Sequence, residues 1–191
     1  MQKTVSMSLE EIVSAVHHAM VGHENYKQTA GEAGLIRALV TVVHSGPNEG
    51  SVCPKQEVAA CLRIACDESD SNSQGMAKCS GLSGLLELMA TGQLQAKEEA
   101  IASILNACLA CSQNLEYVTE KARADLQEIM FSPQFCDEAK LYANYIHIAR
   151  NITRNWHSRT LSNDDGNSLL ELRSNSWCPH RTEKGTDHCF W

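Results

Sequence analysis

The chain contains the stretch Ala33-Gly-Leu-Ile-Arg-Ala-Leu-Val-Thr-Val-Val43 and repeats its pattern without a gap in Cys79-Ser-Gly-Leu-Ser-Gly-Leu-Leu-Glu-Leu-Met89, 46 residues later. In both stretches apolar residues recur at helical spacing, so each predicts a short helix with one buried face. Similar short helices repeated along a chain bury these faces by stacking one copy on the next. The repeat therefore decides the predicted fold.

A break and a second helix follow each stretch. Ser45-Gly46-Pro47 ends the first helix, and Thr91-Gly92 ends its counterpart. The Ala-rich runs at 56–66 and 97–108 then predict a further helix in each unit. The sequence thus predicts a repeating unit built from short helices.

A third copy has the same order of a helix, a break and a second helix. Ala122, Leu126 and Ile129 carry its apolar face, Ser132-Pro133 breaks it, and the run at 138–152 supplies a long helix. The three breaks lie 46 and 41 residues apart, close to the roughly 40 to 47 residues of known helical repeats. Three units are about the number that such a stack needs for stability.

A separate helix is predicted in front of the repeats, within residues 1–24. Ser8-Leu-Glu-Glu11 has the pattern of a capping box, which marks a helix N-terminus. An apolar stripe follows at helical spacing, at Leu9, Ile12, Val13, Val16 and Met20. We expect this helix to cap the N-terminal end of the stack.

These residues resemble the armadillo repeat family. A unit of that family has a short first helix, a second helix similar to Ala-Gly-Gly-Ile-Pro-Ala-Leu-Val-Glu-Leu-Leu, and a long third helix that ends near Ala-Leu-Arg-Asn-Leu. The stretch 32–40 is similar to the second helix, and Ala149-Arg150-Asn151-Ile152 is similar to the end of the third. Short first helices would begin near Asn25, Asn72 and Asn114.

The resemblance implies an all-α protein whose repeats form a right-handed α-solenoid. About three armadillo-like repeats would occupy residues 25–155, divided into 25–71, 72–113 and 114–155. A polar C-terminal tail, expected to be disordered, would follow at 156–191, where Ser, Asn and Asp interrupt the apolar period.

In armadillo proteins the third helices line a concave groove, where an Asn near the end of each helix binds the backbone of an extended peptide. Asn106 and Asn151 match that Asn, whereas Ile64 replaces it in the first unit. Importin-α-like arrays also place a Trp four residues earlier to bind basic peptides. This sequence has other residues there, Ala60, Ala102 and His147, so such a receptor is disfavoured.

The side chains expected to face the groove form a locally basic strip, which consists of Arg63, Ser103, Asn106, His147, Arg150, Asn151 and Arg154. Guanidinium groups form strong charge-assisted hydrogen bonds with carboxylates and phosphates, so an acidic or phosphorylated segment is the expected partner. The alternative is that Arg150 and Arg154 are solvated charges one helical turn apart, with no role for His147.

Composition excludes several classes of function. The 191 residues include 16 Lys and Arg against 23 Asp and Glu, a net charge of −7, which disfavours nucleic acid as a partner. No apolar run approaches the roughly 18 residues of a membrane helix, so no membrane partner is expected. No phosphate-binding loop or recognisable catalytic motif occurs, so we expect neither an enzyme nor a bound cofactor.

The cysteine pattern predicts a reducing compartment. Nine cysteines are an odd number, and most of them lie among Ala, Leu and Ile, where an unpaired thiol packs as a small apolar group. A cytoplasmic or nuclear protein is therefore expected. Cys178, His180, His188 and Cys189 near the C-terminus have the ligand types of a zinc site, but their short spacing strains tetrahedral geometry and favours an unstructured end.

The sequence thus predicts a non-catalytic protein–protein interaction module, either an adaptor or a subunit of an assembly, that binds its partner through the concave face. Two alternatives stay open, namely a regulator of a GTPase or chaperone nucleotide cycle and a zinc-dependent interaction through the C-terminal tail. Self-association through an end repeat is also expected, because an uncovered apolar face favours it.

Overall fold

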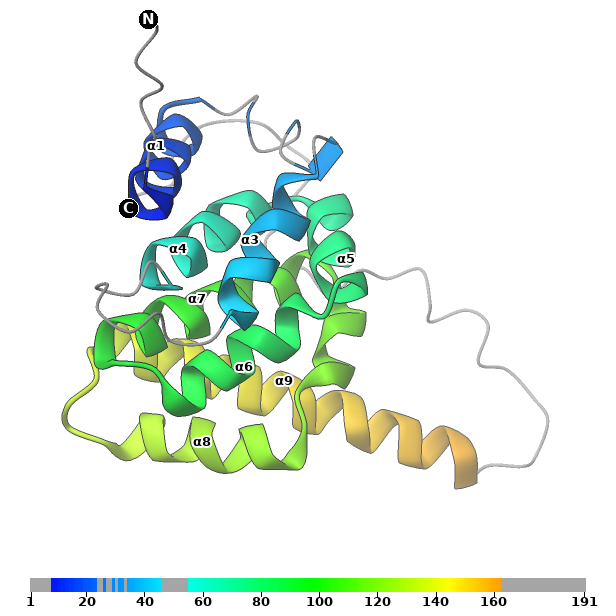
Figure 1. The fold of residues 1–191 in the computed structure, drawn as a ribbon. Coiled ribbons are helices and arrows are strands. Elements are labelled where there is room, and N and C mark those ends of the chain that lie inside the picture. Colours follow the sequence, from blue (N-terminus) through cyan, green and yellow to red (C-terminus); the bar gives the residue numbers. More distant parts are fainter. Residues whose placement is uncertain are drawn as a thin grey trace, which may run out of the picture.

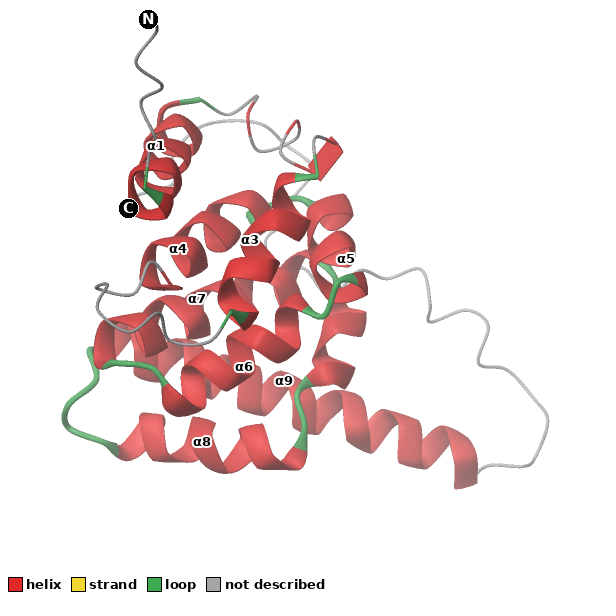
Figure 2. Cartoon of the chain, viewed as in Figure 1, coloured by secondary structure: helices red, strands yellow, loops and turns green. Residues whose placement is uncertain are grey.

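The computed structural model describes residues 8–23, 26, 29, 31–32, 34–45 and 55–162, apart from the side chains of Lys121 and of residues 156–162 (Figure 1). All regular structure in these ranges is helical, and they contain no strand (Figure 2). The predicted all-α class is confirmed. The elements are α1 (Leu9–Gly22), α3 (Leu35–His44), α4 (Lys55–Cys66), α5 (Asp70–Lys78), α6 (Gly81–Thr91), α7 (Leu94–Ala110), the 3₁₀ helix η1 (Ser112–Tyr117), α8 (Glu120–Phe131) and α9 (Asp137–Ser162).

Side-chain caps explain where several of these helices begin. The capping box of α1 is present, since Ser8 Oγ accepts a hydrogen bond from Glu11 N at 3.2 Å and Glu11 Oε2 accepts one from Ser8 N at 2.7 Å. Ser69 caps α5, and Thr119 caps α8 by accepting a hydrogen bond from Ala122 N at 3.3 Å. Such caps satisfy the free N–H groups of the first helical turn.

The two repeated stretches form α3 and α6, and the Ala-rich runs form α4 and α7. In the third copy the corresponding helices are α8 and α9. A short α-helix, α5, lies where a first helix was expected near Asn72, but the segment at Asn114 is the 3₁₀ helix η1. The first helix expected near Asn25 falls mostly outside the described residues.

Helix α9 is longer than the sequence predicted. We expected the last repeat to end at residue 155, whereas α9 continues without a break to Ser162. The run after residue 152 has little apolar character but contains no Gly or Pro that would stop a helix. The rest of the expected tail, 163–191, lies outside the described residues.

The helices are stacked in the order of the chain. Helix α1 packs on α4, α4 packs on α7, and α7 packs on α9. Beside this row, α3 packs on α6, and α6 packs on α8. In Figure 1 the two rows run from α1 at the top to α8 and α9 at the bottom.

One buried hydrogen bond recurs along the stack. Asn72 Nδ2 donates to the carbonyl oxygen of Ala65 at 2.7 Å, and Asn114 Nδ2 donates to that of Ala107 at 2.8 Å. Both amides are buried, and each connects a short helix to the carboxyl end of the helix before it. The two bonds are 42 residues apart in the chain, so the repeat is visible in polar contacts as well as in apolar spacing.

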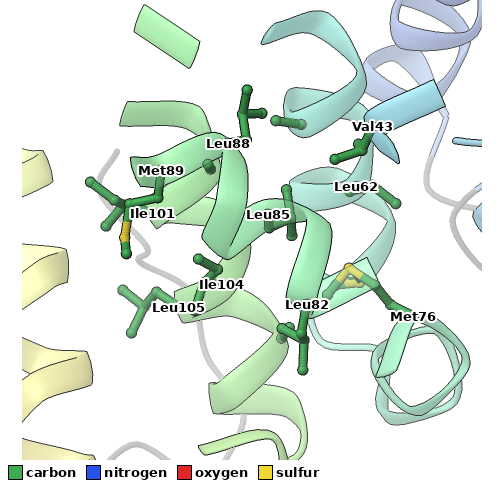
Figure 3. Close-up of a cluster of buried hydrophobic side chains, with 14 of the residues drawn as sticks. Val43, Leu62, Met76, Leu82, Leu85, Leu88, Met89, Ile101, Ile104 and Leu105 are labelled. Atoms are coloured by element: carbon green, nitrogen blue, oxygen red, sulfur yellow. Dashed lines mark hydrogen bonds between the residues drawn. The ribbon is translucent and has the colours of Figure 1, made fainter. Parts of the chain in front are cut away.

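The centre of the core lies where α4, α6 and α7 meet (Figure 3). Its fully buried side chains include Leu62, Leu82, Leu85, Ile101 and Ile104. The stack ends on an uncovered apolar stripe of α9, because Leu141, Tyr145 and Ile148 are 49%, 57% and 46% exposed. Spacings of four and three residues put these three side chains on one helix face.

Candidate protein-binding site

Two arginines of α9 converge on one carboxylate at the start of α8. Arg150 Nη2 lies 3.2 Å from Glu120 Oε1, and Arg154 Nη1 donates to the same oxygen. The two arginines are one helical turn apart, so both side chains leave α9 on the same side. Glu120 is the first residue of α8, so the contact joins the start of α8 to α9.

A third arginine contacts the other oxygen of this carboxylate. Arg123 Nη1 lies 3.7 Å from Glu120 Oε2, on the next turn of α8. We call Arg123, Arg150 and Arg154 the arginine cluster. Hydrogen bonding by Arg150, together with the charges of all three guanidinium groups, lowers the pKa of Glu120.

The arginine cluster borders a hollow between η1 and α9. Its volume is about 420 Å³, and it is lined by Leu115, Glu116, Val118, Arg150, Thr153 and Arg154. The hollow combines apolar side chains with two guanidinium groups and one further carboxylate. The hollow is an open depression of the surface and not an enclosed cavity.

Arg150 is held more rigidly than its neighbours. Its side chain is only 13% exposed, and its Nε donates to the carbonyl oxygen of Val118, which precedes the cap of α8. Its Nη1 is buried and has no hydrogen-bond acceptor among the described residues. Arg154 and Arg123 are more accessible, with side chains 62% and 40% exposed. The cluster therefore has one largely buried member and two that are more exposed to solvent.

The predicted groove residues of the first two units form a separate group, between α4 and α7. Arg63 Nε donates to Glu99 Oε2 at 3.1 Å, and Asn106 Nδ2 donates to the carbonyl oxygen of Arg63 at 3.2 Å. These contacts hold the two helices together. The group lies on a different helix pair from the arginine cluster.

Ser103 does not line a groove surface, contrary to prediction. Its side chain is fully buried, and Oγ lies 2.6 Å from the carbonyl oxygen of Ala59 and 2.8 Å from that of Glu99, which share its single hydroxyl hydrogen. Helical spacing placed it one turn from Asn106, but α4 packs against α7 at this position and covers the side chain of Ser103. His147 and Asn151 lie half-buried on α9, near the cluster in sequence.

Glu120 and Arg123 were missed by the sequence prediction. The available signal was Thr119, a good N-cap residue just before the predicted helix at Ala122. Acidic residues favour the first turn of a helix, so Glu120 was identifiable as the start of α8. The contact between this start and α9 was not visible, because it depends on how the two helices pack.

Within the described residues, no group of three or more His, Cys, Asp or Glu side chains is arranged to hold a metal ion. The four predicted zinc ligands, Cys178, His180, His188 and Cys189, lie outside these residues. Burial raises the pKa of Cys61, Cys66 and Cys108 to about 12, so these thiols are protonated at neutral pH. They are core side chains without nucleophilic character.

None of the described helices is both long and apolar enough to span a bilayer. In comparisons with known proteins, no family model and no curated protein matches this chain.

Proposed function

We propose that this chain is a non-catalytic protein–protein interaction module, built as a short right-handed α-solenoid of three armadillo-like repeats. Support comes from the order of packing, in which each helix contacts the corresponding helix of the next unit. The hydrogen bonds of Asn72 and Asn114 repeat at the same positions of successive units. Nearest-neighbour contacts of this kind are the defining property of solenoids.

The partner is a protein segment that carries acidic or phosphorylated residues, and it binds at the arginine cluster. The observation that carries this proposal is the convergence of Arg150 and Arg154 on one carboxylate beside a hollow of about 420 Å³. Arginine side chains bind carboxylate and phosphate groups through paired, charge-assisted hydrogen bonds. On a chain of net charge −7, such a cluster is a local exception that attracts anionic groups.

The module acts as an adaptor or as a subunit of a larger assembly, in the cytoplasm or the nucleus. Its groove residues Arg63, Ser103 and Asn106 stabilise the stack. Arg150 and Arg154, supported by His147 and Asn151 on the same helix, contact the partner. This division of roles follows from the hydrogen bonds of the first three residues within the α4–α7 pair.

Fluorescence anisotropy with short fluorescein-labelled peptides, rich in aspartate or phosphoserine, tests the proposal. The variant Arg154→Glu reverses the charge of an exposed member of the cluster without disturbing the core. The matched control is Arg37→Glu, which makes the same change at an exposed position of α3. Circular dichroism confirms that both variants fold.

We expect the wild type and Arg37→Glu to bind the acidic peptides equally, and Arg154→Glu to bind at least about tenfold more weakly, a loss of about 1.4 kcal/mol. Equal binding by all three proteins would contradict the site. Absence of binding by the wild type up to about 1 mM peptide, a limit of about −4 kcal/mol, would contradict the proposed partner.

A further inference from the structure

Glu120 occupies the position that an acidic ligand of the arginine cluster would take. Its Oε1 lies 3.2 Å from Arg150 Nη2 and accepts a hydrogen bond from Arg154 Nη1, and its Oε2 lies 3.7 Å from Arg123 Nη1. These are the contacts that a carboxylate or phosphate of a partner would make. The Glu120 side chain is also 55% exposed, so it is free to rotate into solvent.

We propose that Glu120 is a tethered competitor for the arginine cluster, and that the ligand which displaces it is a phosphoserine or phosphothreonine within a partner protein segment. This inference rests on the proposed function, because it assigns the ligand and the regulation of the same site. It adds two claims, namely that an internal carboxylate limits affinity and that a phosphoryl group displaces this carboxylate better than a partner's carboxylate does.

The charges of the described side chains favour a dianion. When Glu120 leaves, the three arginines carry three positive charges, and Glu116 at the edge of the hollow carries one negative charge. The resulting excess of two positive charges is matched by a phosphoryl group, whose charge is about −1.5 to −2 at neutral pH. A carboxylate would only repeat the contacts that Glu120 already makes within the chain, at an entropic disadvantage.

Hydrogen-bond geometry favours the same ligand. Arg150 Nη1 is buried without an acceptor among the described residues, and the carboxylate of Glu120 is already shared among three guanidinium groups. A phosphoryl group offers three acceptor oxygens instead of two.

The hollow favours a phosphorylated segment over free phosphate. The hollow has a volume of about 420 Å³ and is open to solvent, and Leu115 and Val118 contribute an apolar part to its wall. A residue next to the phosphorylated one would cover this wall. Displacement of Glu120 leaves α8 intact, because Thr119 supplies the cap.

The test measures anisotropy with a fluorescein-labelled peptide that has one central phosphoserine between leucines. The same peptide is made with serine and with glutamate at that position. Glu120→Gln removes the competing charge while keeping the shape of the side chain. The control Glu128→Gln makes the same change at an exposed position of the same helix, away from the cluster.

We expect Glu120→Gln to bind the phosphopeptide about tenfold more tightly than the wild type if Glu120 occupies the arginines in about nine molecules of ten. Glu128→Gln should bind as the wild type does. In the wild type the phosphopeptide should bind about tenfold or more tightly than the glutamate peptide, and the serine peptide should not bind. Inorganic phosphate at the concentration of the peptide should not displace it.

If Glu120→Gln and the wild type bind the phosphopeptide with equal affinity, Glu120 does not compete for the arginines. If the phosphoserine and glutamate peptides bind equally well, the ligand is not specifically a phosphoryl group. Displacement by an equal concentration of inorganic phosphate would show that the surrounding segment is not recognised. None of these results contradicts the proposed function if Arg154→Glu still binds acidic peptides more weakly than the wild type does. Failure of every acidic peptide to bind both the wild type and Glu120→Gln would overturn both proposals.

Discussion

Asn72 and Asn114 donate equivalent buried hydrogen bonds, each to the carbonyl oxygen seven residues earlier in the chain. In both places the acceptor is an alanine near the carboxyl end of a long helix, and the donor lies in the short helix that follows. The bond therefore fixes the turn between one unit and the next. Carbonyl groups near a helix end have few backbone donors, so each amide supplies a donor there, and the Ala107 oxygen also accepts a hydrogen bond from Cys111 N at 3.1 Å.

Loss of this bond should destabilise the chain. We expect Asn114→Ala to lower the free energy of unfolding by about 0.5–1.5 kcal/mol, because a buried amide hydrogen bond is lost while the carbonyl oxygen of Ala107 keeps its bond from Cys111 N. Urea unfolding followed by circular dichroism measures the change, with Gln113→Ala at the exposed neighbouring position as control. Equal stability of these two variants would show that the bond has no structural role.

Two glycines in neighbouring helices should respond in opposite directions to the same substitution. A Cβ atom at Gly81 would collide with Met76 Cγ and lie 2.7 Å from Val40 Cγ2, so we expect Gly81→Ala to destabilise the fold by about 1–3 kcal/mol. At Gly75, within α5, a Cβ atom would meet no other atom within 4 Å. Gly75→Ala should therefore stabilise it by about 0.5–1 kcal/mol through helix propensity. Thermal unfolding measures the change in stability of each variant relative to the wild type. A destabilised Gly75→Ala would contradict the packing of α5.

The lowered pKa of Glu120 predicts a pH dependence of stability. A carboxyl group whose pKa is lower in the folded chain stabilises the fold above its ordinary pKa of 4.5, and this contribution disappears as the pH falls through the lowered value. The wild type should therefore be more stable than Glu120→Gln at neutral pH, and the difference should shrink below about pH 4.5. Melting temperatures measured across this range give the result, with Glu128→Gln as control. A difference that is constant with pH would mean that Glu120 is not paired with the arginines.

The uncovered stripe of α9 predicts self-association. Leu141, Tyr145 and Ile148 are exposed together on the last helix of the stack, and contiguous apolar surface of this kind favours contact between proteins. We expect sedimentation velocity to show dimers that increase with concentration, and Tyr145→Lys to shift the protein toward monomer. Tyr117→Lys, at a half-exposed tyrosine of η1, is the matched control. A wild type that stays monomeric at all concentrations would contradict self-association through this face.

The sequence predicted the helices well because their signals are local. Apolar spacing, the breaks at Thr91-Gly92 and Ser132-Pro133, and the cap at Ser8 act within one or two turns, and the structure has helices with these boundaries to within a few residues. The continuation of α9 to Ser162 was missed because a polar composition weakens the apolar period without itself ending a helix.

The candidate site was harder to predict because it depends on distant contacts. Ser103 was expected on the surface, but the approach of α4 places the carbonyl oxygen of Ala59 against its hydroxyl group. Arg150 and Arg154 were predicted to lie one helical turn apart on the same helix. Their shared contact with Glu120 was not, because the distance between Glu120 and α9 is set by the packing of α8, which apolar spacing alone does not determine.

Helix α7 limits how this chain can be divided. The six consecutive residues Ala100–Leu105 are all buried, and six residues cover more than one full turn, so the middle of α7 is enclosed from every direction. A fragment that ends before α8, or one that begins after α5, would leave one side of this helix in water. Proteolysis or splicing inside the repeats would therefore bring into water side chains of α7 that are buried in the intact stack.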